Sequence, residues 1–538
     1  MSKLPVPAVE SVTGGRKWHE MERVLDRAAD VLNCHQYVVL SLFSACYFLI
    51  TCYLASRKLF WFDELFTVYI SRLHGLSAVW GALMKGVDFN PPLLYAFTQL
   101  SESVFGEGQI ATRLPEIISF WIFCLCLFRF ISVRISPLSG YIGMLFPLVT
   151  GAYFYAYEAR SHGIVLGFAG IALVCWQAAA ARSERRFGWI LGLGGALALA
   201  MLTHSFALLL LVPIGFGELV RTVRARRIDW PIWLTLAAST LAILISLPLL
   251  RGVKSALGPS FFPATLRALV DSYKSHLEPA GSVLAATLFL LCIVQVVPPW
   301  RVPESNGERT LGEHEIVAIL GFMGIPILVF LATRITGAPM LARYSTACVA
   351  GFACLLGAGV ARRPALGFCV LLILLAGIGG SFISFQRSSA LTEPSTSLPI
   401  STRLQEFKTK YNGMDAASDK DLPIVLLHNL EFLPIAYYAP PRLSSRMFYL
   451  VWGKADINGE GYRRLRECCE SKCRVSSLSD FLASHQRFLA FGHRGDPKLD
   501  YFIRDGADVT IEKESSNQVL WSVSYKTKGR TSAVREAP

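Results

Sequence analysis

The sequence predicts an α-helical polytopic membrane protein with about eleven transmembrane helices and a small C-terminal α/β soluble domain. Composition is the first reason, because the 538 residues are 53% hydrophobic and only 17% charged, with a mean hydropathy of +0.44. A soluble protein of this size is less apolar. The second reason is that the apolar residues gather into runs of about 20, the length of a helix that crosses a bilayer.

Each such run is expected to be one spanning helix. The runs lie at about 36–54, 114–133, 138–156, 161–181, 188–205, 206–220, 231–250, 281–299, 316–333, 345–361 and 365–384. Residues 1–35 are polar and mixed in charge, so we expect a cytoplasmic tail without a cleavable signal peptide, and the first run serves as the anchor.

The net charge of +13 predicts an orientation rather than a nucleic-acid partner. Arginines gather in every second loop, at 129–136, 182–187, 221–227, 299–315 and 361–364. Loops rich in arginine stay in the cytoplasm, which places the N-terminus inside. An odd number of spans then places the C-terminal domain outside, and we expect a bacterial inner membrane.

The first outer loop, 55–112, is too polar to span but has an apolar stripe from Leu65 to Leu83 at helical spacing. This pattern predicts helices that lie in the membrane interface. A second stretch, Leu93 to Val104, follows two prolines that suit a helix start. As a twelfth span it would reverse every later loop against the arginine bias.

The spanning domain is expected to cover residues 36–384 and the extracytoplasmic domain residues 385–538. In the second of these, short apolar runs predict strands at 423–428, 447–451, 488–492 and 519–525, and helices at 430–438, 462–469 and 478–484. Such alternation favours an α/β domain. Cys468, Cys469 and Cys473 have no histidines at zinc spacing, and one local disulfide among them is a candidate.

Asp63 and Glu64 are the first candidates for chemistry, because they stand in an aromatic segment just after the first span. A carboxylate is costly inside a bilayer, so the pair should lie at the interface, half desolvated, where a carboxylate is a better base. The alternative is that both acids cap an interfacial helix, whose dipole favours negative charge at its N-terminus.

Further polar residues are predicted to reach the same outer surface. Glu158 and Arg160 point in different directions on a helix, so each needs another partner, and Arg113 is the structural alternative for Glu158. His204 could equally be an interface residue with a hydrogen bond. Arg343, followed by Tyr344, offers planar donors for a phosphate, although arginines at span ends also extend towards water without a catalytic role.

Six short motifs occur in an order that resembles the GT-C class of membrane glycosyltransferases, over about residues 36–384. They are Asp63-Glu64, Asn90-Pro91-Pro92-Leu93-Leu94-Tyr95, Arg113-Leu114-Pro115, Tyr155-Ala156-Tyr157-Glu158-Ala159-Arg160, Thr203-His204-Ser205-Phe206-Ala207 and Arg343-Tyr344. The chain is most similar to glycosyltransferase family 39, which includes protein mannosyltransferases and lipid A aminoarabinose transferases. It departs from that family at Asn90, where a histidine is common, and at His162, where a tyrosine or similar residue is common.

The resemblance implies transfer of a sugar from a polyprenyl-phosphate donor, with inversion, to an acceptor glycan, lipid or protein. Asp63 would be the general base, Glu158 would assist or bind the sugar, and Arg343, with Arg113, would hold the carrier phosphate. The other residues expected to bind substrate are Glu64, Asn90, Tyr155, Tyr157, Arg160, His204 and Tyr344. No cofactor is expected, and the resemblance leaves a divalent metal open.

Two other functions suit many spans with intramembrane charges. A transporter or flippase of lipid-linked sugars would show inverted repeats and broken helices near the midplane, whereas here the polar residues are expected at one surface. A membrane scaffold would serve only the C-terminal domain. The sequence names neither the sugar nor the acceptor.

Overall fold

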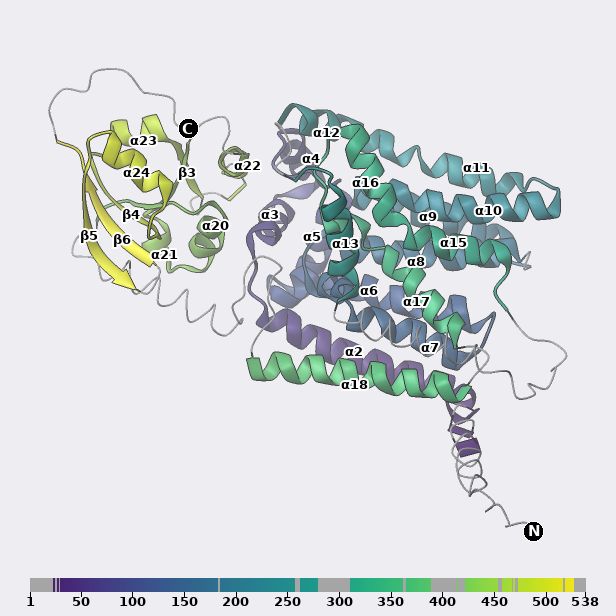
Figure 1. Cartoon of the computed structure of the whole chain (residues 1–538). Coiled ribbons are helices and arrows are strands. Elements are labelled where there is room, and N and C mark those ends of the chain that lie inside the picture. The colour runs from purple at the N-terminus through teal and green to yellow at the C-terminus, as the bar shows by residue number, and fades with distance from the viewer. Residues whose placement is uncertain are drawn as a thin grey trace, which may run out of the picture.

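The computed structural model describes residues 30–181, 184–256, 262–278, 310–360, 364–388, 421–452, 457–466, 473–515 and 518–526, with a few single positions beside them. Within these ranges a bundle of long helices carries a sheet domain at one end (Figure 1). Most of the predicted tail, the run at 281–299 and most of residues 389–420 lie outside the described residues.

Seven described helical segments are long and apolar enough to cross a membrane. They are α2 (Gln36–Arg57), α6 (Gln109–Ser132), α8 (Ser161–Ala180), α9 (Arg186–Thr203), η3 (Ser205–Leu210) with α10 (Leu211–Ala225), α11 (Trp230–Ser239) with the first part of α12 (Ala242–Ala256), and α18 (Pro364–Ser388). An eighth span is formed if α15 (Glu313–Met323) and α16 (Ile325–Thr336) count as one. These two meet at 53°, where Pro326 at the start of α16 cannot continue the hydrogen bonding of α15.

Two predicted runs differ from single straight helices. The run at 138–156 forms α7 (Pro137–Leu145) and two 3-10 turns, η1 (Phe146–Val149) and η2 (Gly151–Tyr157), because Pro147 has no N–H for an α-helical bond. The run at 345–361 contains η4 (Ala342–Ser345) at its edge and the short helix α17 (Cys348–Gly359). Another short helix, α13 (Leu266–Leu277), packs against η4.

Close packing of α8 against α6 places the start of α8 beside the start of α6. Gly163, Gly167 and Gly170 form a stripe on α8, and a Cβ on Gly167 would lie 2.7 Å from the carbonyl oxygen of Ser119 on α6. Small residues let two helix backbones approach in this way. The segment around Glu158 is therefore held against the first turns of α6.

The loop 55–112 contains three helices, α3 (Phe62–Ser71), α4 (Gly75–Met84) and α5 (Leu93–Phe105). The Trp61 N–H donates to Glu64 Oε2 at the start of α3, and the acids in this first turn suit the helix dipole. At 13 residues, α5 is shorter than a spanning helix, and it packs against α3 and α6.

The C-terminal domain is a six-stranded mixed sheet in the order β3-β2-β1-β4-β6-β5. The strands are β1 (Ile424–Leu426), β2 (Met447–Val451), β3 (Arg474–Ser477), β4 (Arg487–His493), β5 (Asp508–Ser515) and β6 (Gln518–Ser524). The first four run parallel, with Ile424 opposite both Met447 and Leu489, and β6 pairs antiparallel with β4 and β5.

Helices connect the parallel strands, as an α/β domain requires. They are α20 (Asn429–Tyr438), α21 (Pro441–Ser444), α22 (Ile457–Leu465) and α23 (Leu478–Ser484), and α24 (Pro497–Arg504) follows between β4 and β5. The predicted helical membrane fold with a small α/β domain is confirmed. The sequence missed β3, β5, α21 and α24, and a disulfide joins Cys469 to Cys473.

Candidate active site

An ion pair between Asp63 and Arg343 lies at the end of the bundle that carries the C-terminal domain. Asp63 stands in the first turn of α3 and Arg343 in η4, 280 residues later, and Arg343 Nη1 donates to Asp63 Oδ2 at 2.5 Å. The side chains are 16% and 25% exposed, so a ligand can reach both. A carboxylate and a guanidinium that are far apart in the sequence therefore meet at a partly exposed site.

Arg113 forms a frame behind this pair, inside the protein. Its Nε and Nη2 donate to the two oxygens of Glu64 at 2.7 and 2.8 Å, and its Nη1 donates to the carbonyl oxygens of Ala55 and Lys58. Nη2 also reaches the carbonyl oxygen of Leu59 at 3.2 Å, so all five N–H donors are used. Because Arg113 is fully buried and fully bonded, it has no donor for the phosphate that the resemblance assigned to it.

The partner of Glu64 determines the charge of that carboxyl. Burial alone would raise the pKa of Glu64, but Arg113 and Lys58 outweigh burial and lower this pKa to about 2. Glu64 Oε1 also accepts the backbone N–H of Ala159 at 2.8 Å. Glu64 is thus a permanent anion that ties α3 to α6 and to the segment before α8.

Glu158 differs from Glu64 in charge and in bonding. Its Oε1 accepts the indole N–H of Trp61 at 2.9 Å, while its buried Oε2 has no hydrogen-bond partner among the described residues. Burial, with a contribution from Glu64, raises the pKa of Glu158 to about 7, although Lys58 acts against this shift. The alternative that Glu158 pairs with Arg113 is wrong, because Arg113 binds Glu64.

Asp88, which the sequence analysis did not single out, is the partner of Arg160. Arg160 Nη1 donates to Asp88 Oδ2 at 2.6 Å and also reaches the backbone carbonyl oxygen of Asp63 at 3.2 Å. Burial would raise the pKa of Asp88, but Arg160 outweighs burial and lowers it. Asn90 donates to the same carboxylate at 3.3 Å and accepts from Ser161 Oγ at 3.0 Å. Through Arg160, these hydrogen bonds link the loop before α5 to Asp63.

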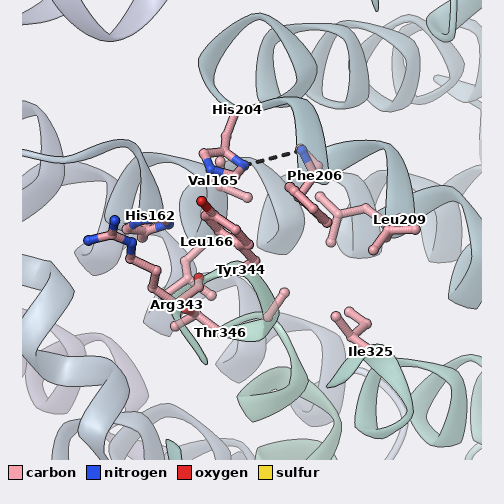
Figure 2. A pocket seen from close by; sticks show the side chains of 13 residues that line it. His162, Val165, Leu166, His204, Phe206, Leu209, Ile325, Arg343, Tyr344 and Thr346 are labelled. Carbon is pink, nitrogen blue, oxygen red and sulfur yellow. Dashed lines mark hydrogen bonds between the residues drawn. The ribbon is translucent and has the colours of Figure 1, made fainter. Parts of the chain in front are cut away.

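A small cavity opens beside Arg343, and Figure 2 shows the side chains around it. The ring of His204 lies 5.1 Å from that of Tyr344 and 5.2 Å from that of His162, and the Phe206 ring stacks on Tyr344 at 4.5 Å. One side of the cavity is polar and the other apolar. The apolar lining is Val165, Leu166, Phe206, Ala207, Leu209, Leu210, Ile325 and Ala347.

Arg134 and Arg221, which come from two of the predicted inner loops, lie at the other end of the spanning helices. Arg134 Nε donates to Glu315 Oε1 at 2.8 Å, and this carboxylate also accepts from Gln177 at 2.9 Å. Gln177 is 15 residues along α8 from His162, which corresponds to about 22 Å of helix. A second group at this end joins Arg221 to Glu218 and Asp229.

Most of the predicted site residues therefore converge. Asp63, Glu64, Asn90, Arg113, Glu158 and Arg160 form one connected network with Arg343, and Tyr155, His204 and Tyr344 surround His162. Tyr157 instead packs against Tyr153 and Phe154. Asp88, Trp61 and His162 were missed, although the first two are polar groups close to motifs. In the described ranges, no group of three or more His, Cys, Asp or Glu side chains is arranged to hold a metal ion.

Comparison with known proteins concerns the family and the fold. Residues 90–251 match the family model described as dolichyl-phosphate-mannose-protein mannosyltransferase. The structure is similar to ArnT from Cupriavidus metallidurans in the apo state, with a TM-score of 0.57, 12% identity, and coverage of 91% of this chain and 98% of ArnT. ArnT from the same organism bound to undecaprenyl phosphate is similar with a TM-score of 0.55 and 13% identity, and the match covers 90% of this chain and 98% of ArnT. No curated protein matches the chain by sequence.

The family match lies in the part of the chain that holds Asn90, Arg113, Glu158, Arg160 and His204, and the shared fold extends to the C-terminal domain. Both findings confirm the resemblance that the motifs indicated. The glycosyltransferase family model over residues 90–251 and the fold shared with ArnT together support a membrane glycosyltransferase of the GT-C class.

Proposed function

We propose that this enzyme transfers a sugar from a polyprenyl-phosphate donor to an acceptor hydroxyl or similar nucleophile at the extracytoplasmic membrane surface, with inversion. The ion pair of Asp63 and Arg343 carries the proposal, because it sets a proton acceptor beside a phosphate-binding group in a partly open site. The similarity to ArnT bound to undecaprenyl phosphate supports a lipid-linked donor.

Arg343 is the group that suits the donor phosphate. Among the described residues, the Arg343 guanidinium donates one hydrogen bond to a carboxylate, from Nη1 to Asp63. A guanidinium has five N–H donors in all. A phosphate can therefore bind in a bidentate manner and compete with Asp63 for Nη1. Donor binding would then release the carboxylate for its chemical role.

Asp63 acts as the general base in the proposed reaction. The acceptor oxygen attacks the anomeric carbon from the face opposite the phosphate, its proton passes to Asp63, and the bond from the carbon to the phosphate oxygen breaks. The leaving polyprenyl phosphate keeps the electron pair, and Arg343 stabilises its charge. A single displacement of this kind inverts the configuration at the anomeric carbon.

The remaining residues divide into two groups. Glu158, with an unpartnered oxygen and a pKa of about 7, can donate a hydrogen bond to a sugar hydroxyl when protonated. His204, Tyr344 and Tyr155 line or adjoin the cavity and suit contacts with the donor. We assign Glu64, Arg113, Arg160 and Asn90 a positioning role, because each bonds other groups of the protein, although the buried Arg160 Nε has no hydrogen-bond partner among the described residues.

The orientation follows from the two ends of the bundle. The described arginine-rich loops around Arg134 and Arg221 lie at the end remote from Asp63, and such loops are typical of the cytoplasmic side. The disulfide between Cys469 and Cys473 suits an oxidising compartment at the opposite side. We therefore propose a bacterial inner membrane with the C-terminal domain in the periplasm.

The test uses the purified full-length protein and a panel of polyprenyl-phosphate sugars, with donor consumption as the readout. We expect one donor to be consumed, and the Asp63→Asn variant to lower kcat by about 100-fold or more, as for loss of a general base. Asp480→Asn, which changes an exposed aspartate of α23, should leave kcat unchanged. Wild-type transfer by Asp63→Asn would exclude Asp63 as the base, and a product that retains the donor's anomeric configuration would exclude the single displacement.

A further inference from the structure

The C-terminal domain packs directly on α3, the helix that carries Asp63. One face of α3 presents Phe62, Phe66 and Tyr69, at the spacing of one helical stripe. Tyr462 of α22 fits between the first two, with ring centroids at 5.6 Å from Phe62 and 6.3 Å from Phe66. Tyr437 of α20 meets Tyr69 at 6.0 Å.

The contact between α3 and the C-terminal domain is buried and closely packed. Tyr462 has no exposed surface, and Phe66 is 7% exposed. Both belong to one hydrophobic cluster that includes Leu65 of α3 and Phe432 and Leu433 of α20. Aromatic rings packed in this way fix the relative position of the elements that carry them.

Polar contacts attach the same domain to the ends of the catalytic loops. The Phe60 N–H, three residues before Asp63, donates to the hydroxyl of Tyr438 at 2.7 Å. Arg464 of α22 donates to the carbonyl oxygen of Gly86 at 3.2 Å, two residues before Asp88. Gly86 has a φ of +73°, a backbone conformation that favours glycine, and a Cβ there would lie 2.8 Å from Arg464 Nη1, the movable end of that side chain.

The other side of α3 holds the groups of the active site. Asp63 binds Arg343, Glu64 binds Arg113, and Thr67 Oγ1 lies 3.4 Å from Arg160 Nη1. The helix is therefore enclosed between the bundle, which supplies the reacting groups, and the C-terminal domain, which covers the aromatic stripe. A shift of the domain would shift Asp63 against Arg343.

We propose that the C-terminal domain is a positioning element of the active site, and that Tyr462 and Tyr438 hold α3 so that Asp63 faces Arg343. The expected effect on kcat rests on the proposed function, whereas the expectation that the domain holds α3 does not. Tyr438 bonds the Phe60 N–H and Tyr462 packs on Phe62 and Phe66, whereas Arg343 lies in η4 of the bundle. The two residues should therefore affect kcat and leave binding of the carrier phosphate unchanged.

The experiment compares Tyr462→Ala, Tyr462→Phe and Tyr438→Phe in the full-length protein. Tyr501→Ala is the matched control, because Tyr501 of α24 packs on Trp452 in a separate cluster of the same domain. Hydrogen exchange of peptides from α3 reports how readily the hydrogen bonds of this helix open, and therefore how firmly the helix is held. Transfer assays give kcat, and titration with undecaprenyl phosphate gives the Kd of the carrier.

We expect Tyr462→Ala to speed exchange in α3, to lower kcat by about 10- to 100-fold and to change the Kd by less than about twofold. Tyr462→Phe keeps the ring but loses the hydrogen bond from its hydroxyl to the Asn429 carbonyl oxygen, so its kcat should lie between those of the wild type and Tyr462→Ala. Tyr438→Phe should lower kcat by about three- to tenfold because the Phe60 N–H loses its partner. Tyr501→Ala should change neither exchange in α3 nor kcat.

Two results would overturn the inference. One is unchanged exchange in α3 in Tyr462→Ala, and the other is faster exchange with an unchanged kcat. If Tyr462→Ala fails to fold, Tyr438→Phe decides on the same readouts, because it removes a single hydroxyl. If the wild-type protein consumes no donor, the proposed function fails, while the exchange experiment still decides whether the domain holds α3.

Discussion

Replacing Asp88 by Asn tests whether the buried ion pair of Asp88 and Arg160 positions Asp63. The side chains of Asp88 and Arg160 are each 9% exposed, and their closest atoms are 2.6 Å apart. Removing the charge of one partner leaves the other buried and unpaired, which typically costs about 3–5 kcal/mol. The carboxylate also accepts from the Tyr95 hydroxyl at 2.7 Å, so an amide nitrogen at that place would face a donor.

We expect two effects of Asp88→Asn. The melting temperature in detergent should fall by an amount on the order of 5 °C. The turnover should fall by about 100-fold, because Arg160, which bonds the backbone carbonyl oxygen of Asp63, loses its anchor, and a displacement of about 1 Å has effects of this size. Thermal unfolding and kcat of the purified variant measure both.

An exposed pair provides the matched control. Arg267 and Asp271 are 3.9 Å apart at 92% and 62% exposure, so Asp271→Asn should cost less than about 1 kcal/mol. The pKa of Asp88 is lowered, so its contribution to stability is present above the unfolded pKa and lost only as the pH falls through the folded value. The loss in Asp88→Asn should therefore be constant between pH 6 and 8. Wild-type melting and turnover in Asp88→Asn would refute the reasoning.

The remaining predictions concern Glu158 and the two arginines with different roles. The pKa of Glu158 is raised to about 7, so the folded state holds a proton that the unfolded state has lost, and stability should fall as the pH rises from about 4.5 to 7. In Glu158→Gln this fall should be smaller by up to about 3 kcal/mol, measured as melting temperature against pH, and an identical profile would contradict the prediction. Arg343→Gln should lower kcat/KM by about 10- to 160-fold, equivalent to about 1.5–3 kcal/mol of charge-assisted bonding, with melting close to wild type. Arg113→Gln should instead destabilise the protein by about 3–5 kcal/mol, because it leaves Glu64 buried without its partner; equal melting of the two arginine variants would refute this division.

The sequence predicted the elements of the C-terminal domain well where their patterns are local. The strand at 447–451 and the helix at 478–484 occur with the predicted bounds, since an apolar run or an amphipathic turn is visible in a short window. The helix predicted at 462–469 instead covers Ile457–Leu465. The strand β5 was missed because its residues are polar and exposed, and its partner β6 defines it as a strand.

The motifs predicted that Asp63, Glu158, Arg160 and Arg343 lie near one another, but they could not predict the pairs. The sequence analysis named Arg113 as a candidate partner of Glu158. The structure selects Glu64, because α6 brings the guanidinium under the first turn of α3.

The sequence by itself determined that the chain spans a membrane, that a small α/β domain follows, and that six motifs of a glycosyltransferase occur in order. These properties depend on hydrophobic length, periodicity and short patterns, which are local. Only the tertiary structure decided that Asp88 anchors Arg160, that Arg113 is internal, and that Tyr462 packs on α3. Ion pairs and ring contacts act over a few ångströms, so they depend on how distant segments pack, and close packing is set by details such as the glycines of α8.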